Sequence, residues 1–410
     1  MSKKKLKIAI FHLGFFFSGG GERLVLEEAK GLRKMGFDVD LYAPIIDKKA
    51  CFPDISSKME IKALVPQIRN LPLREFFHII ASIIVTPVTF WRFLEYDIFI
   101  AANQPGPILS LILGKLLKKP YVAYLAQPTR ILYPRREDIE TGYGGKIDFI
   151  IFSLVVRLAK PFIKWLDAVS IKEADAVLTN GEYISSVIRR IYKVRTINCP
   201  AGCFPKQSFV SFNPKRYQGF VKVRNTKIAK PFILLTNRHF PQKKFEYAIS
   251  CFPIILKEFP GLSMVITGGK TAYTRQLEKL VKKLNLEDKI FFSGFVDEET
   301  LERLYRNAVV YQYTSSMEDF GMGVIEAMAV GTPVVAWDKA GPSKIVVSGE
   351  SGFLATPFDL VDFADKSLQI IKNPDLAGKL AKGAIARAKQ FSYGRHLEIF
   401  EKTIIASVDG

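Results

Sequence analysis

Cysteine is scarce in this sequence, and no metal-binding spacing accompanies it. Only 4 cysteines occur among 410 residues. The one close pair, Cys199 and Cys203, lacks the C-x2-C spacing and the paired histidines of a zinc site. We therefore expect reduced cysteines that serve packing in a reducing compartment, and no metal site.

Long apolar runs are also missing. The basic start of the chain precedes only a short strand-like segment, and Ser18 and three glycines follow where a signal peptide would have a long apolar region and a cleavage site. A cytoplasmic start is expected. The apolar stretch at residues 76–93 is interrupted by Pro87 and is shorter than the ~20 residues that cross a bilayer.

A second apolar stretch, residues 147–171, carries interspersed Arg and Lys, as an amphipathic helix at a membrane surface does. The composition of this stretch and of residues 76–93 allows two interpretations. Both segments are either interfacial helices or buried core helices.

Acidic residues are in deficit in the first part of the chain. Residues 1–250 hold 40 Lys and Arg against 20 Asp and Glu, whereas residues 251–410 hold 19 against 20. The excess behind the net charge of +19 therefore lies in the first part. It predicts an anionic partner there, either an acidic membrane surface or a phosphate-bearing substrate, unless it is only a solvated basic face. No nucleic acid is expected, because no nucleic-acid-binding motif occurs.

Short apolar segments alternate with helical patterns in both halves of the chain. This alternation predicts an α/β fold with two doubly wound parallel sheets. A stretch rich in Lys, Arg, Pro and Asn interrupts it. We predict an N-terminal domain at residues 1–205, a linker at 206–230 and a C-terminal domain at 231–392. The expected strands lie at residues 6–11, 38–43, 97–101, 121–125, 176–179, 231–237, 262–268, 289–295, 308–314 and 333–338.

Two glutamates, Glu318 and Glu326, flank the start of a predicted helix in the second half. The loop before this helix leaves the carboxyl end of a strand, which is where doubly wound sheets bind ligands. Gly321 and Gly323 would let a ligand approach the backbone closely. Glu326, one turn inside the helix, could accept hydrogen bonds from vicinal hydroxyls. The alternative is that Glu326 only interacts with the helix dipole.

Phosphate-binding features accompany the acidic pair. Arg238 and Lys243 follow the first strand of the second half, and two cations at one sheet edge suit a diphosphate leaving group. Residues 18–23 form a second glycine loop before a helix. This loop lacks the G-x-G-x-x-G spacing and is weak evidence alone.

Together these features resemble the retaining glycosyltransferases of family 4, whose GT-B fold has two Rossmann-like domains facing across a cleft. The residues of the E-x7-E motif correspond to Glu318 and Glu326, and those of the R-x4-K clamp to Arg238 and Lys243. Residues 19–23 match the GGAER-like loop of the family. The stretches 291–308 and 326–336 also match the family, and the likeness extends through nearly the whole chain.

The resemblance implies roles for these residues. Glu326 would hold the ribose of a nucleotide sugar, and Glu318 would lie beside the donor sugar. Arg238 and Lys243 would bind the diphosphate, so that no metal or cofactor is required. Arg238, Lys243 and Glu318 are thus the catalytic candidates. Further donor contacts would come from the backbone amides of Gly20, Gly21, Gly321, Met322, Gly323 and Val324. The helix at residues 393–410 would join the N-terminal domain, which binds the acceptor.

One departure from the family pattern is visible. Many relatives have an H-x-P histidine where this sequence has Ala126 or Gln127 before Pro128. Gln127 and Arg130 therefore become acceptor-side candidates. His12, at the end of the first predicted strand, is a third.

The resemblance implies transfer of a hexose, with retention, from a nucleotide diphosphate sugar to a membrane-associated glycan or lipid-linked acceptor. Residues 19–52 are similar to mannosyltransferases that extend lipid-linked oligosaccharides, so the expected donor is GDP-mannose, with a UDP-sugar second. The basic first part predicts a peripheral protein at the inner face of an anionic membrane. The alternatives are a nucleotide-sugar epimerase and a catalytically inactive nucleotide-sugar-binding protein.

Overall fold

The computed structural model describes residues 5–68, 73–135, 138–139, 150–202 and 214–410. The chain divides into two units. Of the described residues, the first unit contains 5–68, 73–135, 150–201 and 394–410, and the second contains 138–139, 202 and 214–393.

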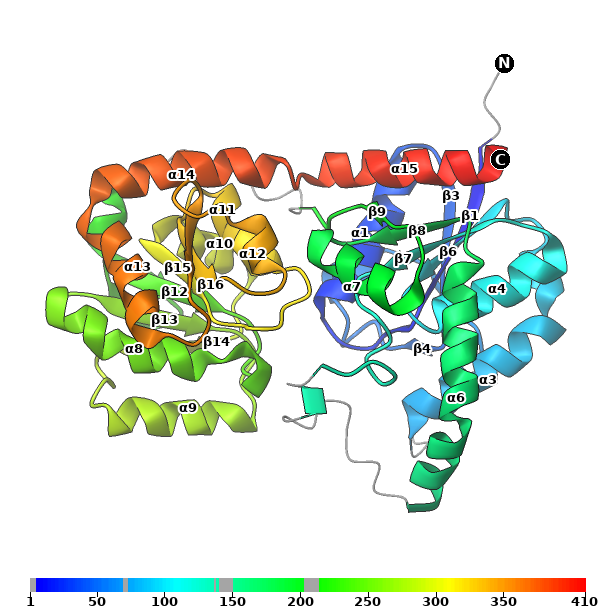
Figure 1. Ribbon diagram of the computed structural model, residues 1–410, viewed down its shortest axis with the longest axis horizontal. Helices are drawn as coiled ribbons and strands as arrows, with labels where there is room; N and C mark the ends of the chain where they lie inside the picture. Colours follow the sequence, from blue (N-terminus) through cyan, green and yellow to red (C-terminus); the bar gives the residue numbers. More distant parts are fainter. Residues whose placement is uncertain (1–4, 69–72, 136–137, 140–149, 203–213) are drawn as a thin grey trace. The chain divides into compact units, whose positions relative to one another are not determined.

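The first unit is built on a seven-stranded sheet whose paired strands all run parallel (Figure 1). The strand order is β5-β3-β1-β6-β7-β8-β9, so the order reverses at β1. Its strands are β1 (Lys7–His12), β3 (Asp38–Ala43), β5 (Ile61–Ala63), β6 (Ile98–Ala102), β7 (Tyr121–Leu125), β8 (Ala176–Thr179) and β9 (Ile197–Asn198). The short strands β2 (Gly14–Phe15) and β4 (Ile45–Ile46) pair separately.

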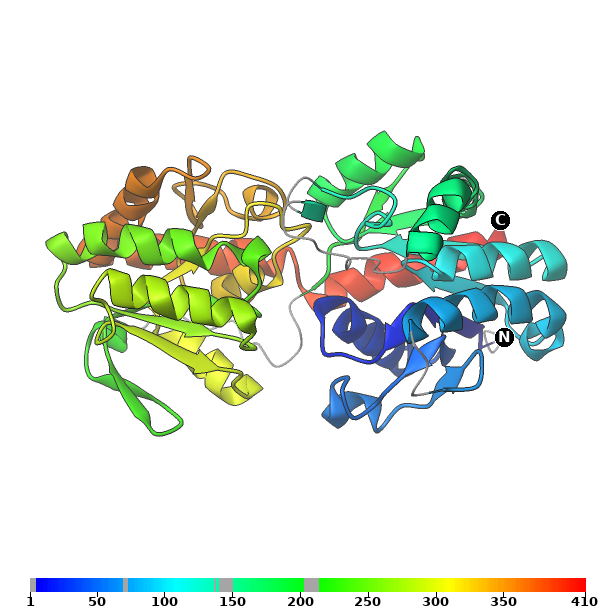
Figure 2. The same ribbon diagram turned by 90° about the horizontal axis from the view of Figure 1, so that it is seen from below.

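The helices of the first unit connect and cover these strands. They are α1 (Gly20–Lys34), α2 (Pro53–Ser56), α3 (Arg74–Val88), the 3-10 helix η1 (Phe90–Phe93), α4 (Gly106–Leu117), α6 (Ile150–Lys172), α7 (Glu182–Tyr192) and α15 (Tyr393–Asp409). Figure 2 shows α3, α4 and α6 as one layer, and α4 contacts both of the others. The core beneath this layer is aromatic, with Phe11, Phe93 and Phe99 at its centre.

The second unit contains a six-stranded parallel sheet in the order β14-β13-β12-β15-β16-β17, which reverses between β12 and β15. Four strands are buried along nearly their whole length, as expected for a sheet covered on both faces. The six strands are β12 (Phe232–Thr236), β13 (Ser263–Thr267), β14 (Ile290–Gly294), β15 (Val310–Tyr313), β16 (Val334–Trp337) and β17 (Gly352–Ala355).

Helices lie on both sides of the second sheet (Figure 1). The helix α8 packs against α9 and α13 on one side, and α11 packs against α10 and α14 on the other. The helices of this unit are the 3-10 helices η2 (Pro214–Tyr217) and η3 (Pro241–Lys243), and α8 (Phe245–Glu258), α9 (Ala272–Lys283), α10 (Glu298–Asn307), α11 (Met322–Ala329), α12 (Pro342–Ile345), α13 (Leu360–Lys372) and α14 (Pro374–Lys389). The fold is therefore α/β with two doubly wound sheets, as the sequence predicts.

The predicted linker at residues 206–230 is wrong over residues 214–230, which are a folded part of the second unit. The strands β10 (Phe220–Val223) and β11 (Thr226–Ala229) form an antiparallel hairpin. Arg216 is buried and donates hydrogen bonds of 2.7 Å to the carbonyls of Val330 and Gly331. These carbonyls accept hydrogen bonds from the Arg216 guanidinium, which allows the charged side chain to be buried. From the composition of the segment alone, this basic residue is expected to be exposed to solvent.

Candidate functional site

The switch point of the second sheet brings together two loops, one after β12 and one after β15. Parallel strands bind ligands beyond their carboxyl ends where the strand order reverses. Asn237 opens the first loop with a φ of 141°, and its backbone N–H donates to Thr267. A side chain on Gly268 would collide with the Asn237 carbonyl, so glycine is required where the two segments touch.

His239 anchors the loop after β12 to the start of α9. It is completely buried, and its Nδ1 lies 3.0 Å from the Thr274 hydroxyl. Burial lowers the pKa of His239 to about 4, so the ring is neutral at pH 7. This histidine therefore supports the loop and supplies no charge to the site.

Lys243 and Glu318, predicted in separate motifs, are in direct contact. The Lys243 Nζ lies 2.6 Å from Glu318 Oε2, and the Tyr313 hydroxyl donates to the same oxygen at 2.8 Å. Burial and the neighbouring Glu318 carboxylate raise the pKa of Tyr313 well above its usual value, which keeps it a hydrogen-bond donor. The Lys243 and Glu318 side chains are 21% and 23% exposed, so a ligand can reach both.

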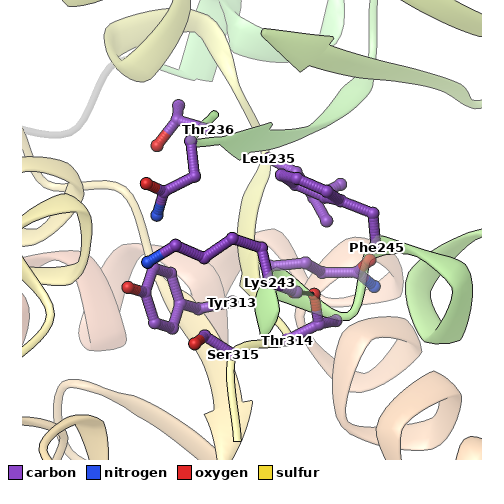
Figure 3. Close-up of a pocket in the computed structure, with 9 residues that line it drawn as sticks. Leu235, Thr236, Lys243, Phe245, Tyr313, Thr314 and Ser315 are labelled. Atoms are coloured by element: carbon purple, nitrogen blue, oxygen red, sulfur yellow. Dashed lines mark hydrogen bonds between the residues drawn. The ribbon is translucent and has the colours of Figure 1, made fainter. Parts of the chain in front are cut away.

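A small pocket lies beside this ion pair, and Figure 3 shows the Lys243 side chain extending past it toward the Tyr313 hydroxyl. The Thr314 hydroxyl donates to the Lys243 carbonyl at 2.8 Å, and the buried Trp337 indole donates to the Thr314 carbonyl at 2.9 Å. These bonds hold the β12 and β15 loops in register. The pocket is lined by Leu235, Thr236, Asn237, Lys243, Phe245, Gln312, Tyr313, Thr314 and Ser315.

A cluster of hydroxyl groups positions Glu326. The Tyr305 hydroxyl donates to Glu326 Oε2 at 3.0 Å. Thr236 Oγ1 lies 3.1 Å from the Tyr305 hydroxyl and 2.7 Å from that of Tyr311. A side chain on Gly323 would collide with the Tyr311 hydroxyl, so the cluster packs directly against the start of α11.

The helix-dipole alternative for Glu326 does not fit this geometry. The helix α11 begins at Met322, which places Glu326 beyond the first turn, where the dipole effect has faded. Gly321 precedes the helix with a φ of 111°, a conformation suited to glycine. The amide of Val324 donates to the Gly321 carbonyl at 2.9 Å. Val324 would therefore contact a ligand through its amide only by giving up this bond.

Arg238 lies in the same loop as Lys243. Its side chain is exposed, and the guanidinium lies 5.4 Å from the centre of the Phe240 ring. The structure thus places both predicted cations in the segment that follows β12. Lys243 contacts Glu318 of the acidic pair.

The glycine loop of the first unit leads into α1, with Gly19 as the extended residue before the helix. A side chain on Gly20 or Gly21 would meet no protein atom within 4 Å. The fold itself therefore does not require glycine at these two positions. Because Gly20 and Gly21 have no side chains, the backbone N–H groups of the first turn of α1 stay accessible to an anion.

The three acceptor-side candidates lie in different settings. Gln127 is exposed just after β7, and Arg130 is half-buried in the same loop. His12 is 3% exposed, and its Nδ1 lies 3.0 Å from the Gly14 carbonyl. Burial lowers the pKa of His12 to about 4. His12 is therefore neutral at pH 7, and its ring contacts the turn from β1 to β2.

Sequence reasoning missed Asp167, a buried carboxylate on α6. Its Oδ1 accepts hydrogen bonds from Thr129 Oγ1 at 2.6 Å and from Gln104 Nε2 at 3.0 Å. It therefore ties together the loops that follow β6 and β7, including the loop of Gln127. Burial raises the pKa of Asp167. The available signal was an acidic residue within the apolar stretch 147–171.

Cys51, Cys199 and Cys251 are buried free thiols, while Cys203 lies outside the described residues. Within the ranges that the structure describes, no three His, Cys, Asp or Glu side chains are grouped to hold a metal ion. Over the same ranges, no helix is both long enough and apolar enough to cross a membrane.

The paired doubly wound domains, with an acidic pair and a lysine at a switch point, define a GT-B glycosyltransferase. Two family models match consecutive parts of the chain, "Glycosyltransferase Family 4" at residues 18–199 and "Glycosyl transferases group 1" at residues 220–389. Together the two matches cover most of the sequence. The chain is therefore a glycosyltransferase, with a family 4 segment followed by a group 1 segment.

Relatives match along nearly the full length. The alpha-1,3/1,6-mannosyltransferase ALG2 of Dictyostelium discoideum is 26% identical over 406 residues, which is 91% of each chain. The mannosylfructose-phosphate synthase of Agrobacterium fabrum is 25% identical over 92% of this chain and 84% of its own. Among solved structures, Anabaena Alr3699/HepE in complex with UDP-glucose is 18% identical, with a TM-score of 0.70 over 98% of this chain and 100% of the other.

Proposed function

We propose that this glycosyltransferase moves a hexose, with mannose as the first candidate, from a nucleotide diphosphate sugar to a glycan acceptor with retention at the anomeric carbon. The observation that carries the proposal is the contact of Lys243 with Glu318 beside Glu326 at the switch point of the second sheet. This arrangement offers a cation for a diphosphate and carboxylates for hydroxyl groups.

The ion pair suggests how the site responds to a donor. Without a ligand, Glu318 neutralises Lys243. A diphosphate would compete for the ammonium group because it carries more negative charge than one carboxylate. Lys243, together with Arg238, would then stabilise the leaving group, and Glu318 would be available to the sugar hydroxyls. No metal is required in this scheme, since the cations offset the developing charge.

Glu326 is proposed to hold the ribose. The Tyr305 hydroxyl donates to Glu326 Oε2 and so fixes the orientation of the carboxylate. Retention would follow if the acceptor attacks the anomeric carbon on the face from which the diphosphate departs. No protein nucleophile is assigned in this reaction, and neither glutamate is given that role.

The donor base and sugar are proposed from the relatives. Mannosyltransferase names favour GDP-mannose, and the UDP-glucose complex of HepE makes a UDP-sugar the second candidate. Calorimetric titration of the whole chain with GDP-, UDP- and ADP-sugars tests this order. Tight binding of GDP-mannose alone would support GDP-mannose as the donor. Tighter binding of another sugar nucleotide would make that nucleotide the proposed donor instead.

The acceptor is proposed to be a membrane-associated glycan or a lipid-linked glycan, with the protein peripheral at the inner face of the membrane. The deficit of acidic residues in residues 1–250 supports an anionic surface as partner. Transfer to a lipid diphosphate glycan, without transfer to free sugar phosphates, supports this acceptor. The reverse result would favour a soluble acceptor of the kind that the name mannosylfructose-phosphate synthase describes.

The glycine loop gives a test that separates binding from folding. Replacing Gly20 and Gly21 by Ala should lower donor affinity about tenfold, because methyl groups would obstruct the open helix terminus. Thermal stability should hold or rise slightly, since Ala favours helix. Gly394→Ala is the matched control, because that position is equally open. If Gly20→Ala/Gly21→Ala bound the donor with wild-type affinity, this loop would not be part of the donor site.

A further inference from the structure

The helix α3 has its polar and apolar faces reversed relative to an ordinary surface helix. His78, Ser82 and Thr86 recur every fourth residue and are all buried. The hydroxyls of Ser82 and Thr86 donate to the carbonyls four residues earlier, each at 2.7 Å. These polar groups are satisfied by their own helix, so they can face the protein interior without water.

The opposite side of α3 exposes an apolar stripe to solvent. Within α3, Phe77, Ile80, Ile84 and Val88 follow one another at intervals of three or four residues, which places them on one helical face. Leu73 immediately precedes the helix, and Trp91 lies in η1. Ile84 is 65% exposed, Val88 62% and Trp91 58%. The apolar stripe consists of Leu73, Phe77, Ile80, Ile84, Val88 and Trp91. A contiguous exposed patch of this kind on a soluble surface marks an interaction site.

The ends of the stripe have the composition of a membrane interface. Trp91 is preceded by the exposed Phe90 and followed by the exposed Arg92. Aromatic rings and arginine at the border of an apolar surface are typical of segments that lie at the headgroup level of a bilayer.

A second exposed aromatic group lies on α6, in the layer that α3 and α4 also form (Figure 2). The rings of Phe162 and Trp165 stack with centroids 5.7 Å apart, and both are more than half exposed. Lys160, two residues before Phe162, is exposed as well. One layer of the first unit thus presents two exposed aromatic features, and both include a tryptophan.

The charge around this layer favours lipid over a second copy of the chain. Glu95, after η1, is paired with Lys7, and Glu173, after α6, is paired with Lys115. Residues 1–250, which include this layer, hold 40 Lys and Arg against 20 Asp and Glu. Anionic headgroups would be attracted to such a surface, whereas two copies would repel each other.

We propose that the apolar stripe of α3 and η1 inserts into the interfacial region of an anionic bilayer, with Phe162 and Trp165 of α6 as a second contact. This deepens the proposed function by naming the surface that meets the membrane. The docking itself requires neither donor nor acceptor, so the two proposals can fail separately.

Vesicle sedimentation tests the surface. Ile84→Glu/Val88→Glu should reduce partitioning onto vesicles of phosphatidylcholine and phosphatidylglycerol by about tenfold or more, because two carboxylates would enter the apolar boundary. Val361→Glu is the matched control, since Val361 is 59% exposed on α13 in the second unit. Wild-type protein should bind vesicles of phosphatidylcholine alone more weakly. Equal partitioning of the Ile84→Glu/Val88→Glu variant and the control would overturn the proposal.

Tryptophan fluorescence distinguishes insertion from protein contact. In a Trp165→Phe background, Trp91 is the exposed tryptophan that remains, because Trp337 is buried. Its emission should shift to the blue on addition of anionic vesicles, and Ile84→Glu/Val88→Glu should abolish the shift. No shift in the parent, or a wild-type dimer that Ile84→Glu/Val88→Glu converts to monomer by light scattering, contradicts the lipid assignment.

Turnover separates this inference from the proposed function. With a water-soluble acceptor, Ile84→Glu/Val88→Glu should transfer sugar at the wild-type rate, since none of the altered residues belongs to the donor site. Vesicle binding without sugar transfer to any acceptor would refute the proposed function and leave the docking surface intact. Sugar transfer without vesicle binding would refute the docking surface and leave the proposed function intact.

Discussion

Replacing Lys243 by Ala should lower kcat/KM about 10²–10³-fold, the usual effect of removing one group that stabilises developing negative charge. The loss should appear mainly in kcat, because the leaving diphosphate gains charge as its bond to the sugar breaks. Steady-state kinetics at saturating donor measure this. Stability should change little, because the Lys243–Glu318 pair is partly solvated.

Lys372→Ala is the matched control for this experiment. Lys372 also forms an ion pair, 2.5 Å from Glu258, but on the surface of α13 and α8. Its removal should leave kcat/KM at the wild-type value. If Lys243→Ala were as active as Lys372→Ala, the site at the end of β12 would not be the centre of the reaction.

Replacing His396 by Ala should destabilise the first unit by about 3–5 kcal/mol, the cost of leaving a partner charge buried and uncompensated. His396 Nε2 lies 3.1 Å from Glu28 Oε1, and both side chains have no exposed surface. Because α15 comes from the end of the chain and α1 from its beginning, this contact fastens the C-terminal helix into the first unit. Denaturant unfolding monitored by circular dichroism measures the loss.

The same contact predicts a pH dependence. Hydrogen bonds and charge interactions with Cys199 and Glu28 outweigh burial and raise the pKa of His396 to about 10 from an ordinary value of 6.5. A pKa that is higher in the folded state gives stability that is complete below pH 6.5 and is lost as pH rises toward 10. The free energy of unfolding should therefore fall across this range in the wild type and less steeply in His396→Ala.

An exposed ion pair on the same helix provides the control. Lys402 and Glu398 are 2.7 Å apart with side chains 73% and 59% exposed. Lys402→Ala should cost less than about 1 kcal/mol. Similar losses for Lys402→Ala and His396→Ala would show that the buried pair does not fasten α15.

The main features of the fold, and the residues that it brings together at the candidate site, were predictable from sequence. Alternating strand and helix patterns predict two parallel sheets, and residues after neighbouring strands must meet at one edge. The prediction that Lys243 and Glu318 share a site follows from this rule, and their 2.6 Å contact agrees with it. The E-x7-E spacing likewise places Glu326 one turn inside α11.

Other features depended on packing that a sequence does not display. Tyr305 and Tyr311 are ordinary apolar residues of a helix and a strand until their hydroxyls are seen to meet Thr236. Ser82 and Thr86 would be placed on the solvent side of α3 by polarity alone, but their hydroxyls bond within the helix and the apolar side faces out. A basic segment concealed the β10–β11 hairpin, although Val221 and Val223 alternate with exposed residues as strand positions do.

The most direct test of the central claim is proton NMR of the full reaction with GDP-α-mannose and a lipid diphosphate glycan. We predict release of GDP together with a new α-anomeric mannosyl signal, and no change of the donor when the acceptor is omitted. A β-anomeric product, or conversion of the donor to another sugar nucleotide without acceptor, would contradict a retaining transferase.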